Sequence, residues 1–443
     1  MKDVAFLVWP TADKQTRRAS KSWDWNSNTG AKLLIDVLGR SGIEVGTCSA
    51  ETAHLHKVVL LSLASTFDVH NVIRAVGRLR TWRRPRDFVA IAGGFGMQNV
   101  IPLRDLIDYA AFGRAEGLIV PLVRAALDRA DFDHPSVIPL EGGVRQVTVA
   151  QAPELYPHEV PTQPKPFRER EVGCPRRCLF CHYTFARQHR RAHEAAFTGA
   201  MPWDDREVLF DRLLVDTNLV QRTRTAIDGY SERLRLAFGK PITDDLIRET
   251  LDRASAEWKH RIAWFQVYMI GSFPTETDED RDSFRRVLET VRPTTAAVYL
   301  RIHTTPFRPS PWTPAEYLPA SLEPDWSKRR LDVIVERSRL AVKNTLFLES
   351  PWSHLQSLVV ERATADSDEL IRTMVFSSKL RSRSTAARVT ALANFFDLEP
   401  YLREYHTTER LPTGYVTTHV PRARIVDLAK KLKRSLGIEE AAP

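Results

Sequence analysis

Three of the four cysteines in this 443-residue chain lie within eight positions, at Cys174, Cys178 and Cys181. Their spacing is C-x3-C-x2-C. Three thiolates suit soft iron better than a closed structural zinc site, which usually takes four protein ligands. A cubane iron–sulfur cluster also normally takes four cysteines. With three, one iron keeps an open coordination position, and an open position on a metal is where chemistry takes place.

Zinc is the alternative metal for the same loop. His182 or His189 would then complete the ligand set, as in a zinc knuckle. A disulfide framework is not favoured, because an odd cluster without a secretion signal is typical of a reducing compartment. The cysteines alone leave iron and zinc both open.

The composition is that of a globular protein with two or three domains, with 43% hydrophobic and 27% charged residues. No apolar stretch approaches the ~20 residues of a membrane span, and the amino terminus lacks the pattern of a signal peptide. We therefore expect a cytoplasmic protein with no membrane partner. The net charge of +9 permits a nucleic-acid partner, and the basic residues concentrate at Arg78–Arg86 and Arg168–Arg191. A solvated basic surface, with arginines that neutralise an anionic cofactor, is the alternative.

Residues 1–132 alternate strand and helix patterns, which predicts a doubly wound, Rossmann-like α/β domain with a parallel sheet. The predicted strands are Val4–Trp9, Val45–Cys48, Lys57–Ala64, Asp87–Ala92 and Ala110–Gly113. The predicted helices are Ala31–Leu38, Val69–Leu79, Leu103–Tyr109 and Leu118–Leu127. Ligands of such domains bind at the carboxyl ends of the strands.

Small and polar residues follow three of these strands. They are Ser65 and Thr66 after the third strand, Gly93, Gly94 and Phe95 after the fourth, and Gly113 and Glu116 after the fifth. Glycines at strand ends allow a flat ligand to approach the backbone. A Gly-Gly-Phe-Gly stretch is also typical of a simple tight turn between a strand and a helix.

The remaining chain divides into a Pro-rich linker at 133–166, a second α/β domain at 167–318 and a mostly helical region at 319–443. Glu171–Gly173 is predicted to end the first strand of the second domain, which would place the cysteine loop at the mouth of a barrel. Further predicted elements are strands at Leu213–Asp216, Thr225–Ile227, Ile262–Ile270 and Ala296–Ile302, and helices at Asp244–Trp258, Asp280–Val291, Arg329–Val342 and Asp366–Met374.

The second domain resembles the radical SAM superfamily. Four ordered motifs carry the resemblance, namely CPRRCLFC at 174–181, DGYSERL at 228–234, GSFPTET at 271–277 and TPFRPSPWTP at 305–314. The resemblance implies a partial (β/α)6 barrel in which the three cysteines hold a 4Fe–4S cluster that binds S-adenosyl-L-methionine. It also implies cofactor contacts from Phe180, Asp228, Ser231 and Gly271. Asp228 stands where the family has glutamate, and the Gly-Gly-Glu element of the family is missing.

The first domain resembles the cobalamin-binding domain that often precedes a radical SAM domain. The residues implied in cobalamin binding are Ser65, Thr66, Gly93, Gly94, Phe95, Gly113 and Glu116. The D-x-H-x-x-G motif of a cobalt ligand is incomplete, because residue 73 is isoleucine, and His70 is interpreted as a helix-start residue. The helical carboxyl-terminal region, including Ser353–Thr373, resembles the cap of the barrel in these enzymes.

Together the resemblances imply a cobalamin-dependent radical SAM enzyme that forms a 5′-deoxyadenosyl radical and methylates an unactivated carbon. Ring contraction, cyclisation or another radical reaction, with or without cobalamin, is the alternative, and a zinc-stabilised nucleic-acid-binding protein is the alternative of another class. The enzyme would need a one-electron reductant of the flavodoxin or ferredoxin type. Its substrate, whether small molecule, peptide or nucleic acid, and its oligomeric state stay open.

Overall fold

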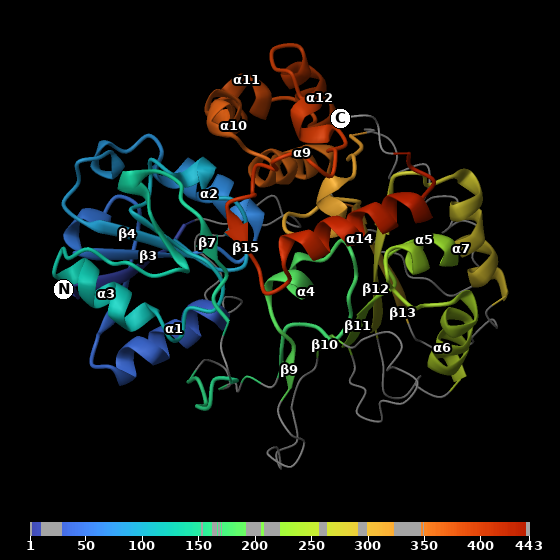
Figure 1. The fold of residues 1–443 in the computed structure, drawn as a ribbon, viewed down its shortest axis with the longest axis horizontal. Coiled ribbons are helices and arrows are strands. Elements are labelled where there is room, and N and C mark those ends of the chain that lie inside the picture. The colour runs from blue at the N-terminus through green and yellow to red at the C-terminus, as the bar shows by residue number, and fades with distance from the viewer. Residues whose placement is uncertain are drawn as a thin grey trace.

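The structure is a computed structural model that describes residues 2–9, 29–151, 154–161, 166, 169, 171–191, 205–207, 222–256, 264–290, 299–322, 347–348 and 350–439. It contains two α/β units joined by a helical carboxyl-terminal region (Figure 1). The prediction of a mixed α/β protein with parallel sheets is confirmed.

The first unit is built on a six-stranded sheet in the order β2-β1-β3-β4-β5-β6. The strands are β1 Val4–Leu7, β2 Val45–Cys48, β3 Val58–Ser62, β4 Val89–Gly93, β5 Tyr109–Ala111 and β6 Val137–Pro139. The first five strands are mutually parallel and β6 is antiparallel to β5. All residues of β1 are buried, as expected for a parallel strand covered on both faces.

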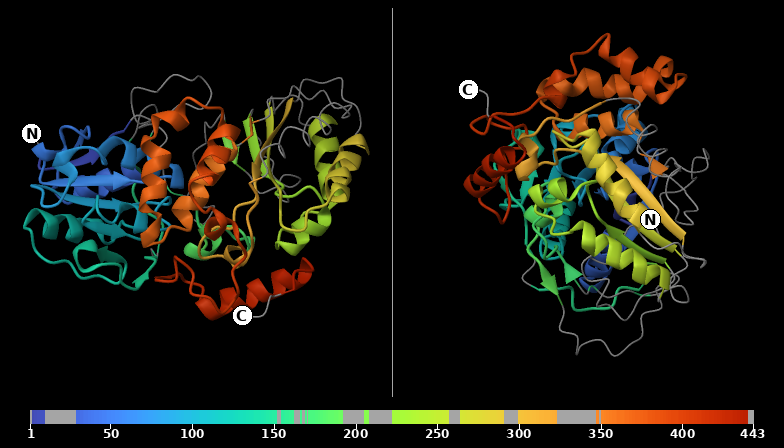
Figure 2. Two further views of the ribbon diagram at one scale, coloured as in Figure 1. Left: turned by 90° about the horizontal axis from the view of Figure 1, so that it is seen from above. Right: turned by 90° about the vertical axis from the view of Figure 1, so that its right-hand side faces the viewer.

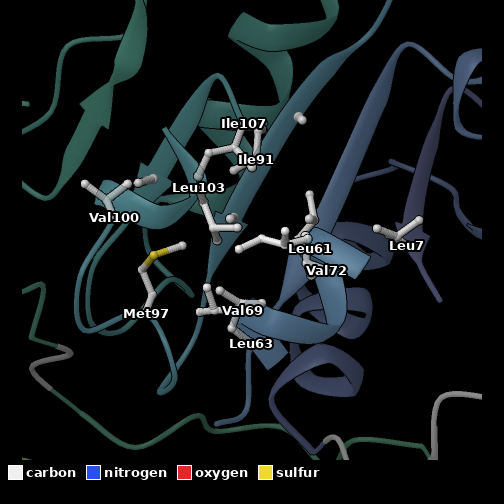
Figure 3. Packing of buried hydrophobic residues seen from close by; sticks show 14 of the residues in the cluster. Leu7, Leu61, Leu63, Val69, Val72, Ile91, Met97, Val100, Leu103 and Ile107 are labelled. Atoms are coloured by element: carbon white, nitrogen blue, oxygen red, sulfur yellow. The ribbon is translucent and has the colours of Figure 1, made fainter. Parts of the chain in front are cut away.

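Helices cover both faces of this sheet. They are α1 Thr29–Arg40 and α3 Ile119–Leu127 on one face and α2 Thr66–Val76 on the other (Figure 1). The side chains of Leu61, Leu63, Val69 and Val72 pack together where β3 meets α2 (Figure 3). These contacts fix the carboxyl ends of the central strands, where the predicted ligand residues begin.

Two predictions for the first unit are wrong. Leu103–Tyr109 is not a helix, because a short 3-10 turn at Ile101–Leu103 is followed by a loop that leads into β5. The Pro-rich segment at 133–166 is not simply a linker, because it contributes β6 and also β7 Val147–Thr148. Pro139 is compatible with a strand here because β6 lies at the edge of the sheet.

The second unit is built on a five-stranded parallel sheet in the order β10-β11-β12-β13-β14. Its strands are β10 Asp205–Glu207, β11 Arg222–Ala226, β12 Trp264–Gly271, β13 Tyr299–Pro306 and β14 Phe347–Leu348. Its helices are α5 Glu232–Ala237, α6 Asp244–Ala256 and α7 Asp278–Thr290.

The predicted first barrel strand is not part of that sheet. Glu171–Val172 forms β8, which pairs antiparallel with β9 Arg190–Arg191. Gly173 explains the difference, because its φ of +72° turns the chain at the start of the cysteine loop. A side chain there would meet the Gln188 carbonyl oxygen at 2.6 Å. The described sheet therefore contains five strands, with the cysteine loop beside it.

The carboxyl-terminal region is mostly helical, as predicted. Its elements are α9 Pro351–Glu361, α10 Asp368–Phe376, α11 Ser378–Arg381, α12 Thr385–Ala393, α13 Glu399–Leu402, β15 Val416–Thr417 and α14 Arg422–Ser435. It does not act only as a barrel cap. Helices α9 and α10 pack on α2 of the first unit, and β15 pairs with β7. Helix α14 lies over the second unit, where it packs on the 3-10 turn Pro314–Tyr317 (Figure 2).

The predicted strand Leu213–Asp216 and helix Arg329–Val342 lie outside the described residues. Within the described parts of the chain, no helix has the length and apolar character needed to cross a membrane.

Candidate functional site

Backbone contacts hold the cysteine loop against the second unit. The Leu179 amide donates to the Phe238 carbonyl at 2.9 Å, and the Ala315 amide donates to the Leu179 carbonyl at 3.0 Å. Gly239 follows Phe238 with a φ of +75°, and a Cβ there would lie 2.9 Å from the Arg177 carbonyl oxygen. The loop is thus fixed between the end of α5 and the segment that follows β13.

Phe180 anchors the same loop through its side chain. Its ring centroid lies 6.0 Å from that of Phe238 and 6.3 Å from that of Phe273. These rings belong to an apolar cluster that also contains Phe307. In the structure, Phe180 therefore packs in the apolar core of the second unit. Its predicted contact with a cofactor would have to be made from this packed position.

The three cysteines are free thiols on this loop. Cys178 is buried, and Cys174 and Cys181 are half-buried. Burial raises the pKa of Cys178 to about 12 and also raises the pKa of Cys181. Cys174 is close enough to both to add to these shifts electrostatically. In the described parts of the chain, no three His, Cys, Asp or Glu side chains are arranged as a metal-binding group.

An ion pair missed by the sequence analysis lies beside Cys178. The Lys240 ammonium contacts the Asp228 carboxylate, and both residues are buried. Lys240 also lowers the pKa of the Cys178 thiol against the larger effect of burial. Gly239, directly before Lys240, has a positive φ. A glycine at this position is the feature of the sequence that could have indicated the turn. The structure thus brings Asp228, Lys240 and Cys178 together.

The carboxyl ends of β11 and β12 hold unusual backbone conformations next to this ion pair. Asp228 has a φ of +52°, and Ser272, directly after β12, has a φ of +58°. Non-glycine residues rarely adopt such values, and they concentrate at functional sites. The Ser272 hydroxyl is buried and makes no hydrogen bond to the described residues. Gly271 ends β12, and its carbonyl accepts a 2.6 Å hydrogen bond from the Phe307 amide.

Ser231 has a helix-capping role in the structure. Its hydroxyl accepts from the Leu234 amide at the start of α5 and donates to the Asp280 carboxylate at 2.5 Å. Arg233 binds the same carboxylate at 2.6 Å, and this pairing lowers the pKa of Asp280 against the effect of its burial. The proton of the Ser231 hydroxyl and one lone pair of its oxygen therefore hold the junction of α5 and α7.

A cavity of about 710 Å³ lies at the carboxyl ends of the first sheet. The order of strands reverses between β1 and β3, which is the topological switch point where α/β sheets bind ligands. Five of the residues predicted for cobalamin line the cavity, namely Gly93, Gly94, Phe95, Gly113 and Glu116. Val172, Tyr183 and Arg187 from the cysteine segment line it too. The cavity therefore lies between the first unit and the chain on both sides of the cysteines.

The other two predicted cobalamin residues do not line this cavity. Ser65 caps α2 in a capping box with Asp68, and the Thr66 hydroxyl lies 3.5 Å from the Ser357 hydroxyl of α9. His70 is buried on the same helix, and its Nε2 donates to the Gln356 carbonyl at 2.9 Å. Burial lowers the pKa of His70 to about 4. The Thr66 and His70 side chains thus contact α9, and the Ser65 side chain caps α2, so none of the three lines the cavity.

The glycines at the strand ends are required by the protein's own backbone. A Cβ on Gly94 would lie 2.4 Å from the Leu63 carbonyl oxygen, and one on Gly96 would lie 2.2 Å from the Ser65 carbonyl oxygen. Gly113 has a φ of +91°, and its Cβ would lie 2.3 Å from the Ala150 carbonyl oxygen. The tight-turn interpretation of the Gly-Gly-Phe-Gly stretch thus explains Gly94 and Gly96, and the turn forms one wall of the cavity.

We expect Gly96→Ala to destabilise the protein by about 2 kcal/mol or more, because the new methyl group clashes with fixed backbone. Gly117→Ala is the matched control, since nothing lies within 4 Å of its Cβ. Thermal unfolding of the two variants measures the difference. Equal melting temperatures would contradict the account of this turn.

Charged groups close one end of the cavity. Arg114 is buried and binds Glu169 through two 2.7 Å hydrogen bonds. It also binds Glu116 at 2.6 Å. The second oxygen of Glu116 is buried with no hydrogen-bond partner in the described residues. This oxygen remains available to a hydrogen-bond donor on a ligand.

Aromatic contacts join the cavity wall to the cysteine loop. The Phe95 ring lies 4.1 Å from the ring of His182, centroid to centroid, and 5.3 Å from that of Tyr183. The Gln98 amide nitrogen lies 2.9 Å from Nε2 of His182. Enclosure of the imidazole lowers its pKa to about 3. His182, one of the two candidates for a fourth zinc ligand, is thus held against the first unit.

No protein-family model matches this sequence, and no curated protein matches it. The fold resembles the solved apo structure of the cobalamin-dependent S-adenosylmethionine radical enzyme OxsB at 12% identity and a TM-score of 0.30. The likeness covers 86% of this chain and 56% of that chain. A TM-score this low supports no conclusion about the function of this chain.

Proposed function

We propose that this protein is a cobalamin-dependent radical SAM enzyme that forms a 5′-deoxyadenosyl radical and methylates an unactivated carbon of its substrate. One observation carries the proposal. The loop with the three cysteines lies between the strained carboxyl ends of β11 and β12 and a cavity at the switch point of a second parallel sheet. An enzyme that uses two large cofactors in one reaction needs two binding sites that face each other. Here one would lie at the cysteine loop and the other in the cavity.

The thiols suit a cluster ligand set in their chemistry. They lie on one loop and influence one another electrostatically, and burial of Cys178 and Cys181 disfavours their free thiolates and favours metal-bound ones. When bound, the cluster and S-adenosylmethionine would supply the radical, and methylcobalamin would supply the methyl group. The protein would hold these groups and exclude water from them.

The pair Asp228 and Lys240 suits the methionine part of S-adenosylmethionine. This moiety carries an ammonium and a carboxylate, and the pair offers the opposite charge to each beside Cys178. Gly271 presents no side chain at the end of β12, which leaves room for the adenosine. The Ser272 hydroxyl next to it is available as a further hydrogen-bonding group.

The cavity suits a large, mostly apolar ligand face with polar edges. Aliphatic and glycine residues of the strand ends form most of its wall, and Phe95 offers a flat ring surface. Glu116 and Arg187 supply the polar groups. We propose cobalamin for this cavity, with its reactive face toward the cysteine loop.

Breaking the ion pair should weaken cofactor binding. We expect Asp228→Asn and Lys240→Met each to lower affinity for S-adenosylmethionine about 30-fold or more, since each change removes the charge proposed to bind the ammonium or the carboxylate of the ligand. Equilibrium dialysis against labelled S-adenosylmethionine measures this effect. The double variant should unfold at a higher temperature than either single variant, because it leaves no unpaired buried charge. Wild-type affinity in both single variants would remove the pair from the binding site.

The proposal is tested by anaerobic reconstitution followed by metal analysis and a cobalamin titration of the same sample. About four irons per chain with stoichiometric cobalamin binding support it. Iron without cobalamin would leave a radical enzyme of another reaction type, and the cavity would need another ligand. Zinc without iron would contradict the proposal and favour the zinc-stabilised nucleic-acid-binding protein.

A further inference from the structure

Helix α14, Arg422–Ser435, has two faces of opposite character. Ile425, Ala429, Leu432 and Leu436 are buried against the rest of the protein. The opposite face is exposed and basic. Its exposed basic residues are Arg424, Lys430, Lys431 and Arg434. They recur at the spacing that places them on one side of a helix.

The apolar face of α14 packs directly over the cysteine loop. Ile425 and Ala429 share an apolar cluster with Phe185 of the short helix α4, His182–Ala186, and Leu179 of the loop packs at its edge. Leu432 belongs to the cluster against which Phe180 packs. One helix diameter, about 10 Å, therefore separates the basic surface from the cysteine loop. In two perpendicular views α14 is the outermost element on this side of the molecule (Figure 2).

The cysteine loop adds a charge of its own to this surface. Arg177 is exposed, and it is close enough to His419, just before α14, to help lower the pKa of that imidazole. A hollow of about 650 Å³ opens at the end of the helix, lined by Lys430, Lys433 and Arg434 among others. In the described parts of the chain, the four exposed basic residues of α14 form no ion pair, whereas Arg422 and Lys433 do.

We propose that the exposed basic face of α14, together with Arg177, is the docking surface for an acidic flavin-containing electron-donor protein of the flavodoxin type. The proposal rests on the proposed function, since that function requires an electron at the cluster. The reduced flavin would lose one electron and the cluster would gain it. Phe180 and Leu179 lie between this surface and the thiols.

Two features favour a donor protein over a nucleic acid. The basic residues cover a single helix of 14 residues, and small, weakly held interfaces are typical of electron-transfer partners. The surface also lies over the cysteine loop, which would receive the electron. Electron transfer requires this proximity, whereas binding of a nucleic acid does not.

The test uses the full-length reconstituted protein and two charge-reversal variants. The first variant is Lys430→Glu/Lys431→Glu/Arg434→Glu on α14. The control is Arg372→Glu/Lys379→Glu/Arg383→Glu, which makes the same charge change at exposed residues of α10 and α11 and their surroundings. Binding of purified oxidised flavodoxin is measured by isothermal titration at low and high salt. Cleavage of S-adenosylmethionine is measured with reduced flavodoxin and, separately, with dithionite.

We expect the α14 variant to lose at least tenfold in flavodoxin affinity and in flavodoxin-driven cleavage, with dithionite-driven cleavage unchanged. The control should match the wild type, and wild-type affinity should fall as salt is added, because exposed charges are screened. Unchanged flavodoxin affinity in the α14 variant would overturn the proposal. The proposal would also be overturned if the α14 variant lost RNA or DNA binding but kept its flavodoxin affinity. That result would assign the surface to nucleic acid.

Failure of the proposed function gives a different result. A wild type that cleaves no S-adenosylmethionine even with dithionite would contradict the function. The binding titration would then still decide whether flavodoxin docks on α14. No flavodoxin binding by an active wild type would overturn the docking surface and leave the function intact.

Discussion

Replacing Cys178 by alanine should reduce the iron content of the anaerobically reconstituted protein from about four to less than about one per chain. Formation of 5′-deoxyadenosine should fall to background in the same sample. Cys178 is the most buried of the three clustered thiols and lies beside Lys240 and Asp228. A water molecule that replaced its sulfur would not supply the thiolate that a 4Fe–4S cluster needs. Inductively coupled plasma mass spectrometry and chromatography of the products measure the two quantities.

Cys48 provides the matched control. It is the fourth cysteine of the chain, it is also buried, and burial raises its pKa to about 12 as it does for Cys178. It lies at the end of β2 in the first unit, outside the cysteine loop. Cys48→Ala should therefore keep full iron content and activity. If Cys178→Ala kept both as well, the cysteines would not be the cluster ligands.

Replacing Arg362 by methionine should release the carboxyl-terminal region from the second unit. The Arg362 guanidinium is buried and donates to the carbonyls of Glu316, Leu318, Tyr401 and Arg403 at 2.8–3.3 Å. Methionine fills a similar volume but donates no hydrogen bond. The loss of these charge-assisted bonds should lower the free energy of local unfolding by at least about 3 kcal/mol, because four buried carbonyls lose their partner.

Hydrogen–deuterium exchange measures this effect where it should occur. The amides of 401–405 and 316–318 should exchange about 100-fold faster or more in the Arg362→Met variant, as a change of about 3 kcal/mol requires. Arg372→Met on exposed α10 is the control and should leave these amides unchanged. Equal protection in the two variants would show that other contacts hold the region.

The sequence predicts the strands well because buried parallel strands are continuous apolar runs. Val45–Cys48 is correct to the residue, and the predicted Asp87–Ala92 differs from β4 by one or two residues at its ends. Gly93, Gly113 and Glu116 line one cavity because the parallel strands β4 and β5 end at the same edge of the sheet. Local patterns of this kind need no information about distant contacts.

The errors concern placements that distant contacts decide. Glu171–Val172 is too short to show its partner, and the turn at Gly173 directs it to β9 instead of the main sheet. Lys240 lies in the stretch that continues the DGYSERL motif but has no role predicted from the sequence, and it reaches Asp228 where Gly239 docks on the cysteine loop. Ser65 and Thr66 stand at the right strand end, but the capping box of α2 and the approach of α9 turn them away from the cavity.

The central claim is that the three cysteines hold a cluster that cleaves S-adenosylmethionine reductively. The most direct measurement is 5′-deoxyadenosine formation by the reconstituted wild-type protein with dithionite, in the absence of oxygen. We expect methionine and 5′-deoxyadenosine in equal amounts, formed by the wild type and by Cys48→Ala but not by Cys178→Ala. No 5′-deoxyadenosine from a sample with a full complement of iron would contradict the claim.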